Sequence, residues 1–166
     1  MTVPYRFDVT ARISELRSAH AGLEAGEETG IEVAVAGRVM LHRGQGKLAF
    51  ATLRDGTGAE IQLFALAKVT ADFDDFVKIS LGDWVGATGE IVKTKTGELS
   101  VKVAGWTMLA ETRRSFGDKW NGVTDVDTRY RQRYVDLWAN PDSRTTLMAR
   151  SRILSLTRRW LEDRGF

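Results

Sequence analysis

One aromatic side chain in the first half of the sequence lies on a strand face where a core residue is not required. In residues 48–54 the side chains alternate, so the small aliphatic residues share one face and Phe50 lies on the other. The same alternation in residues 59–65 places Gln62 outward. A ring beside an amide can stack on an unpaired nucleobase and hydrogen bond to its edge. A second small core covering Phe50 explains the same pattern equally well.

A carboxylate adds to this outward face. In residues 98–109 the apolar side chains alternate with polar ones, which places Glu98 and Lys102 on the outward side. Solvation alone accounts for Lys102. A carboxylate beside a nucleic acid is repelled by the phosphates unless it accepts a hydrogen bond from a base edge. Glu98 is therefore the more informative of the two.

The sequence offers no catalytic or metal-binding constellation. It contains no cysteine, and its two histidines, His20 and His42, are far apart. A thiolate metal site is excluded, and a histidine cluster is disfavoured. Gly44–Gly46 is predicted to be a hairpin turn that no helix follows, which argues against a phosphate-binding glycine loop. We therefore predict no catalytic residue and no metal site.

The composition is that of a globular protein. The chain has 166 residues, of which 43% are hydrophobic and 28% are charged, enough for one domain and part of a second. No apolar run reaches the roughly 20 residues of a membrane helix, and no signal peptide is evident. Together with the absence of cysteine, this predicts a cytoplasmic protein without a membrane partner.

The charges divide unevenly along the chain. Residues 1–111 contain 12 basic and 15 acidic side chains, a net charge of −3, whereas residues 112–166 contain 12 and 7, a net charge of +5. A strong sequence-independent attraction to nucleic acid is therefore not expected from the first part. Binding there would depend on shape, stacking and hydrogen bonds.

The pattern of elements predicts a β-barrel. Glycine-rich turns are expected at Gly44–Gly46 and Asp55–Gly58, a bulge or bend at Gly37, and a helix over Thr70–Ser80. A helix between the third and fourth of five strands is typical of the OB-fold, a five-stranded Greek-key barrel, although an SH3-like barrel has similar strands. The predicted strands cover residues 31–43, 47–54, 59–65, 84–93 and 98–109.

The segments flanking the barrel are predicted to differ in kind. Thr10 can cap a short amphipathic helix within residues 1–30. Residues 111–128 show no period and are predicted to form a linker, with Phe116 and Trp120 packed on a surface.

The C-terminal segment is predicted to be helical. One helix is expected over residues 129–139, and Asn140–Pro141 is a typical start for a second helix that continues through Arg164. The second helix carries more apolar surface than the sequence can cover. We therefore expect the chain to be a fragment of a larger protein.

Six stretches of the sequence, in this order and spacing, resemble a single family. They are VAVAGRVMLHRGQGKLAFATLRD, EIQLF, LGDWVGATGEIVKTKTGELS, DKWNGVTDVDTRYRQRYVDL, NPDSR and RSRIL…TRRWLEDRGF. They resemble the N-terminal part of class II lysyl-tRNA synthetases of bacterial type, over roughly residues 31–166. The aspartyl and asparaginyl relatives share the OB-fold but match less well.

The resemblance implies an organisation and an activity. Residues 1–30 would be an N-terminal helical extension, 31–110 an anticodon-binding OB-fold, 111–128 a linker, and 129–166 the truncated start of a class II α+β catalytic domain. The full-length enzyme would be a homodimer that charges a lysine-specific tRNA using ATP and Mg²⁺. The motifs that bind these cofactors lie downstream in the family, so no cofactor and no complete catalysis are expected of this fragment.

The resemblance also implies roles for individual residues. Phe50 would stack on the central anticodon base, Gln62 would read its edge, and Glu98 would contact the anticodon together with Arg43. The cognate anticodon of the family is U-rich, and uracil offers one N–H donor between two acceptors, which suits an amide or a carboxylate. Arg38 and His42, which are near Arg43, are weaker candidates for anticodon contacts. The candidates for the dimer interface are Leu147, Ile153, Leu154, Trp160 and Leu161.

A second reading belongs to a different class of protein. The chain could be a freestanding OB-fold module for nucleic-acid binding or dimerisation, without synthetase activity. Whether the gene continues past Phe166 into a class II catalytic domain distinguishes the two.

Overall fold

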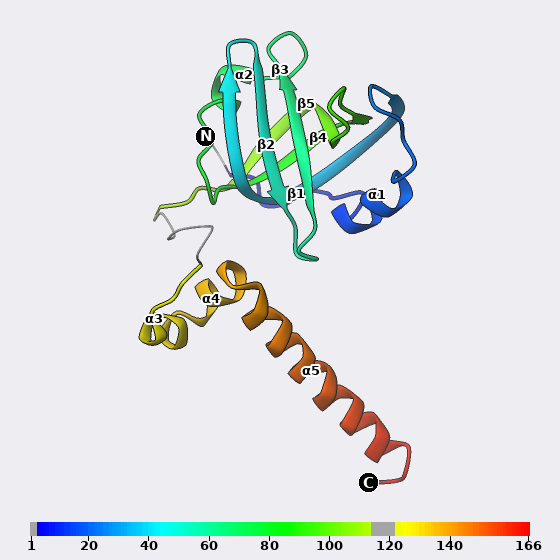
Figure 1. The fold of residues 1–166 in the computed structure, drawn as a ribbon, viewed down its shortest axis with the longest axis vertical. Coiled ribbons are helices and arrows are strands. Elements are labelled where there is room, and N and C mark those ends of the chain that lie inside the picture. The colour runs from blue at the N-terminus through cyan, green and yellow to red at the C-terminus, as the bar shows by residue number, and fades with distance from the viewer. Residues whose placement is uncertain (1–2, 114–121) are drawn as a thin grey trace. The chain divides into compact units, whose positions relative to one another are not determined.

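The computed structural model describes residues 3–113 and 122–166. The chain divides into two compact units, Met1–Ser115 and Phe116–Phe166. Among the described residues, the first unit contains five strands and two short helices, and the second contains three helices (Figure 1).

The strands of the first unit close into a barrel in the order β1-β2-β3-β5-β4. β1 pairs with both β2 and β4, and β3 pairs with β5 in parallel, which completes the ring. The predicted OB-fold is confirmed, with its helix between the third and fourth strands. The strands are β1 (Glu28–Gln45), β2 (Leu48–Arg54), β3 (Glu60–Leu66), β4 (Trp84–Lys93) and β5 (Leu99–Ala110).

The barrel interior is filled by the small aliphatic side chains that the alternation predicted to lie inward. Leu53, Leu63 and Val101 are fully buried there. Ile13 and Phe76, from the two helices, pack into the same core. Because a shift of one residue would move this whole set to the surface, the core also fixes which side chains of these strands face outward.

β1 is a long, bent strand whose bulge was not predicted at its true position. The pairing of β1 with β2 shifts between Val39 and Leu41, where β1 holds one extra residue. The extra residue reverses the alternation, so Arg43 lies on the outward face whereas Val39 is buried. At Gly37 a Cβ atom would lie 2.7 Å from the Arg54 carbonyl oxygen, so glycine permits a close backbone approach there.

The helix α1 (Ile13–Ala19) is held by the barrel, and Thr10 does not cap it as predicted. The Thr10 hydroxyl instead accepts a hydrogen bond from the Ala34 amide at 2.8 Å, which ties the N-terminal segment to β1. The Asp55 carboxylate, in the turn between β2 and β3, accepts a hydrogen bond from the Ile13 amide at 2.9 Å. A barrel residue therefore satisfies one of the free amides of the first helical turn.

The helix α2 (Phe73–Phe76) is shorter than the predicted Thr70–Ser80. Asp72, just before the helix, has a φ of 49°, in the left-handed region. The Thr70 hydroxyl is engaged elsewhere, since it donates to the Val103 carbonyl at 2.7 Å. The left-handed backbone of Asp72 and the hydrogen bond of Thr70 therefore limit α2 to a single turn.

The two predicted turns join β1 to β2 and β2 to β3. Gln45 pairs with Leu48, so the first turn is Gly46–Lys47, shifted from the predicted Gly44–Gly46. Gly46 has a φ of 61°, which favours glycine. The second turn lies at Asp55–Gly58 as predicted.

The second unit contains α3 (Val126–Arg131), α4 (Arg133–Ala139) and α5 (Pro141–Glu162). The single helix predicted over residues 129–139 is two helices, because Gln132 has non-helical φ and ψ of −112° and 56°. α5 begins at Pro141 as predicted and ends before Arg164.

The linker predicted over residues 111–128 includes the described residues 111–113 and 122–128. Its last residues overlap α3, which begins at Val126. The predicted packing of Phe116 and Trp120 lies outside the described residues.

Asp136 is the centre of the second unit. Its fully buried carboxylate accepts hydrogen bonds from Arg129 and Arg133, at 2.9 and 2.5 Å. Asn140 and Ser143 donate to the same carboxylate at 2.6 and 3.1 Å. The five side chains come from α3, α4, the residue before α5 and α5 itself, so this cluster joins the three helices.

We expect the second unit to lose stability in acid as Asp136 is protonated. Burial alone would raise the pKa of Asp136, but the hydrogen bonds from Arg129, Asn140, Ser143 and Arg133 lower it from 3.8 to about 2. A lowered folded-state pKa means that the stabilisation is complete above about pH 4 and is lost as the pH falls through about 2. An NMR titration of the Asp136 carboxyl carbon should give a midpoint near 2; an unperturbed midpoint would contradict the cluster.

α5 has a broad apolar surface that is exposed. Of the predicted interface residues, Leu147 is half-buried, and the other four have exposed fractions of 37–62%. Met148 and Leu156 are exposed to a similar degree. None of the described helices is long and apolar enough to cross a membrane.

Candidate nucleic-acid interface

A row of three side chains crosses the outward face of the barrel from β1 to β3. Arg43 is the cross-strand partner of Phe50, and Phe50 is that of Phe64. The two rings stack with their centroids 5.2 Å apart and an interplanar angle of 14°. The Arg43 guanidinium carbon lies over the Phe50 ring, 5.1 Å from its centroid. Since β2 lies between β1 and β3, the two neighbours cover opposite faces of Phe50.

A second row lies beside the first and carries the amide. Gln62 pairs with Thr52 on β2 and with Ser100 on β5. The Ser100 hydroxyl lies 2.9 Å from the Gln62 side-chain oxygen and 3.1 Å from the Glu98 carbonyl oxygen. Because one hydroxyl donates one hydrogen, Ser100 can serve only one of these acceptors at a time. When the Ser100 hydroxyl donates to the Glu98 carbonyl, the Gln62 oxygen is free to accept a hydrogen bond from a ligand.

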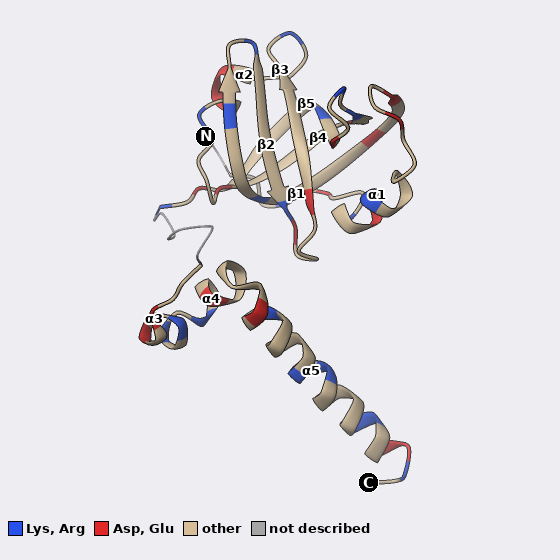
Figure 2. Cartoon of the chain, viewed as in Figure 1, with Lys and Arg blue, Asp and Glu red and all other residues tan. Residues whose placement is uncertain are grey.

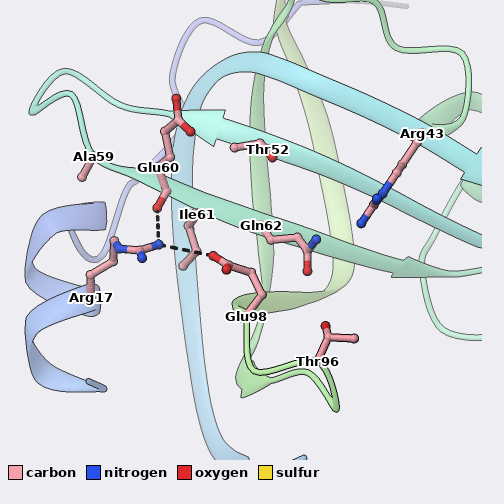
Figure 3. Close-up of a pocket in the computed structure, with 9 residues that line it drawn as sticks. All are labelled: Arg17, Arg43, Thr52, Ala59, Glu60, Ile61, Gln62, Thr96 and Glu98. Carbon is pink, nitrogen blue, oxygen red and sulfur yellow. Dashed lines mark hydrogen bonds and ion pairs between the residues drawn. The ribbon is translucent and has the colours of Figure 1, made fainter. Parts of the chain in front are cut away.

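These rows border a hollow of about 610 Å³. Figure 3 shows Gln62 at its centre, Arg43 at one side and Glu98 at the other. Three of the four principal predicted residues thus line one surface, and Phe50 adjoins it through Arg43. The lining residues are Arg17, Arg43, Thr52, Ala59, Glu60, Ile61, Gln62, Thr96 and Glu98.

The structure adds residues that were not predicted for this surface. Phe64 follows Gln62 by two positions and was expected on the same outward face from the strand alternation, but not as a member of the binding site. Arg17 comes from α1, whose docking on the barrel no local pattern indicates. Thr96 lies in the turn between β4 and β5, near Glu98.

The two weaker candidates lie elsewhere. The Arg38 guanidinium lies over the Trp84 ring, 5.3 Å from its centroid, and donates to the Gly82 carbonyl. His42 lies on the other side of β1 from Arg43 and contacts Phe76 edge to face. Burial lowers the pKa of His42. The structure therefore does not bring Arg38 or His42 to the hollow.

The charges around the hollow are mixed. Figure 2 shows acidic and basic residues interspersed over the barrel strands and α1. Lys102, on the outward face, donates to Glu28 at 2.8 Å, a hydrogen bond that raises the pKa of Lys102. The surface is therefore suited to stacking and to hydrogen bonding with bases more than to a general attraction for phosphates. In residues 3–113 and 122–166 there is no group of three or more side chains suited to hold a metal ion.

Comparison with known proteins agrees with this geometry. Residues 33–109 match a family described as an OB-fold nucleic acid binding domain. The chain is 48% identical over 168 residues to the lysine–tRNA ligase of Synechococcus sp. (strain RCC307), covering 99% of this chain and 33% of the relative. It is also 48% identical over 171 residues to that of Parasynechococcus marenigrum (strain WH8102), covering 98% and 34%. The chain spans about a third of the length of these curated relatives.

Proposed function

We propose that the chain carries the anticodon-binding OB-fold domain found in the N-terminal third of lysine–tRNA ligases, and that its barrel face reads a lysine-specific anticodon. One observation supports the proposal most strongly. The Gln62 amide on β3 and the Glu98 carboxylate beside β5 line one hollow, and the stacked Phe50 ring on β2 adjoins it through Arg43. A strand face that is merely exposed to water does not require a stacked ring, an amide and a carboxylate close together.

The chemistry of uracil fits these groups. Uracil presents an N3–H donor between two carbonyl acceptors. The Gln62 amide can accept from the donor and donate to a carbonyl, and the Glu98 carboxylate can accept an N–H. A row of lysines would bind the phosphates but would not distinguish one base from another.

Base stacking requires Arg43 to move. Phe64 covers one face of Phe50, and the Arg43 guanidinium lies over the other. A base that stacks on Phe50 therefore takes the position of the guanidinium. Arg43, which is exposed, then becomes available to a phosphate of the bound RNA.

The remaining proposals concern a longer protein. The domain limits proposed from the sequence, at residues 30, 110 and 128, would separate the anticodon-binding barrel from the start of a class II catalytic domain. The whole enzyme would join lysine to its tRNA in the cytoplasm, using ATP and Mg²⁺. We assign neither cofactor to residues of this chain. The exposed apolar surface of α5 would form the interface of a homodimer.

The role of Gln62 can be tested by base substitution. We expect Gln62→Ala to reduce the preference for uracil over cytosine at the central anticodon position, by roughly 1–3 kcal/mol, because a paired amide is removed. The measurement is the ratio of dissociation constants for two stem-loops that differ only at that base. Gln45→Ala, which removes an exposed amide from β1, is the matched control. An unchanged ratio in Gln62→Ala would argue against base reading by this residue.

A further inference from the structure

Arg17 joins the helix α1 to the carboxylate that is proposed to read the anticodon. Its Nη1 atom donates to the Glu60 carbonyl oxygen at 2.9 Å. The same nitrogen lies 3.5 Å from Oε1 of Glu98. Figure 3 shows the guanidinium reaching from α1 across the end of the hollow to both residues.

The helix that carries Arg17 is fixed to the barrel. Ile13 and Leu16, on its inner face, are 1% and 6% exposed. The Asp55 carboxylate holds the Ile13 amide at 2.9 Å. The guanidinium therefore approaches Glu98 from an anchored helix, and not from a free surface loop.

We propose that Arg17 is a positioning residue that orients Glu98 for base recognition. The inference rests on the proposed function of the barrel face. The contact with Oε1 leaves Oε2 of Glu98 to accept an N–H from a base. The positive charge also offsets the repulsion between Glu98 and the RNA phosphates.

A role of Arg17 in folding stability alone can be distinguished by experiment from a role in orienting Glu98. The side chains of Arg17 and Glu98 are 47% and 50% exposed, and ion pairs so exposed contribute little to folding stability. Loss of Arg17 should therefore weaken RNA binding without lowering the melting temperature. A direct phosphate contact would also weaken binding, but its effect would be independent of Glu98.

The test is a double-mutant cycle on the full 166-residue chain. Wild type, Arg17→Ala, Glu98→Gln and the double variant are titrated with a U-rich anticodon stem-loop, and each melting temperature is measured. We expect Arg17→Ala to weaken binding about fivefold to tenfold in the wild type, as for loss of a charge-assisted contact. In the Glu98→Gln background the same change should have little effect. Arg6→Ala, which removes a charge from the same unit, should bind like the wild type.

Three outcomes would overturn the inference. The first is normal binding by Arg17→Ala. The second is a loss of affinity by the same factor in both backgrounds, with a smaller salt dependence, which indicates a phosphate contact. The third is a melting temperature that falls in parallel with the affinity. Failure of the wild type to prefer the U-rich loop over a scrambled loop would instead contradict the proposed function itself. The two failures are therefore distinguishable.

Discussion

Replacing Phe50 by alanine is expected to weaken binding of the U-rich anticodon stem-loop by roughly 1–3 kcal/mol, about fivefold to 150-fold. The change removes the stacking surface and leaves Arg43 and Phe64 without the ring between them. Because Phe50 lies on the outward face, the barrel core should be preserved. The measurement is the dissociation constant of wild type and variant at one salt concentration.

Two substitutions serve as matched controls, one elsewhere on β2 and one at position 50 itself. Leu48→Ala removes an apolar side chain from the same outward side of β2, where Leu48 is 38% exposed. It should change affinity much less than Phe50→Ala. Phe50→Trp, which keeps an aromatic face, should retain most of the binding. Equal affinities for wild type and Phe50→Ala would contradict the stacking role.

Replacing Asp136 by alanine is expected to destabilise the helical unit by about 3 kcal/mol, the low end of the range for removing one partner of a buried ion pair, because Arg129 and Arg133 are 38% and 36% exposed and can be solvated. The variant leaves Arg129 and Arg133 without their shared acceptor. Asn140 and Ser143 lose the same partner. The contacts that join α3, α4 and α5 are thereby lost together.

Hydrogen exchange resolved by residue measures this effect within the intact chain. Amides of residues 126–162 should lose protection in Asp136→Ala, whereas those of the barrel should not. Asp127→Ala removes a carboxylate that is 70% exposed and paired with Arg131, so it should have a small effect. Unchanged protection in Asp136→Ala would show that the cluster does not hold the helices together.

The sequence predicted the outward face well because strand alternation is local. Leu53 and Leu63 had to lie inside, which left Phe50 and Gln62 outside whatever the barrel's exact shape. The position of Arg43 was not accessible in this way. It depends on the bulge between Val39 and Leu41, and a bulge arises from the pairing of two strands.

The contacts that could not be predicted from the sequence are mainly those between segments far apart in the chain. Arg17 reaches Glu98 only because α1 docks on the barrel, and the Asp55 contact that assists this docking spans 42 positions. The second unit shows the same limit. Helical periodicity indicates that residues 129–139 are helical, but the break at Gln132 accompanies the convergence of side chains on Asp136.

The most direct test of the proposed function compares two RNAs on the wild-type chain. The first is an anticodon stem-loop with the U-rich anticodon, and the second has the same stem and loop length with the anticodon bases replaced. The proposed function predicts at least about tenfold tighter binding of the first at equal salt, since replacing a contacted base costs roughly 1–3 kcal/mol. Equal dissociation constants for the two RNAs would contradict it.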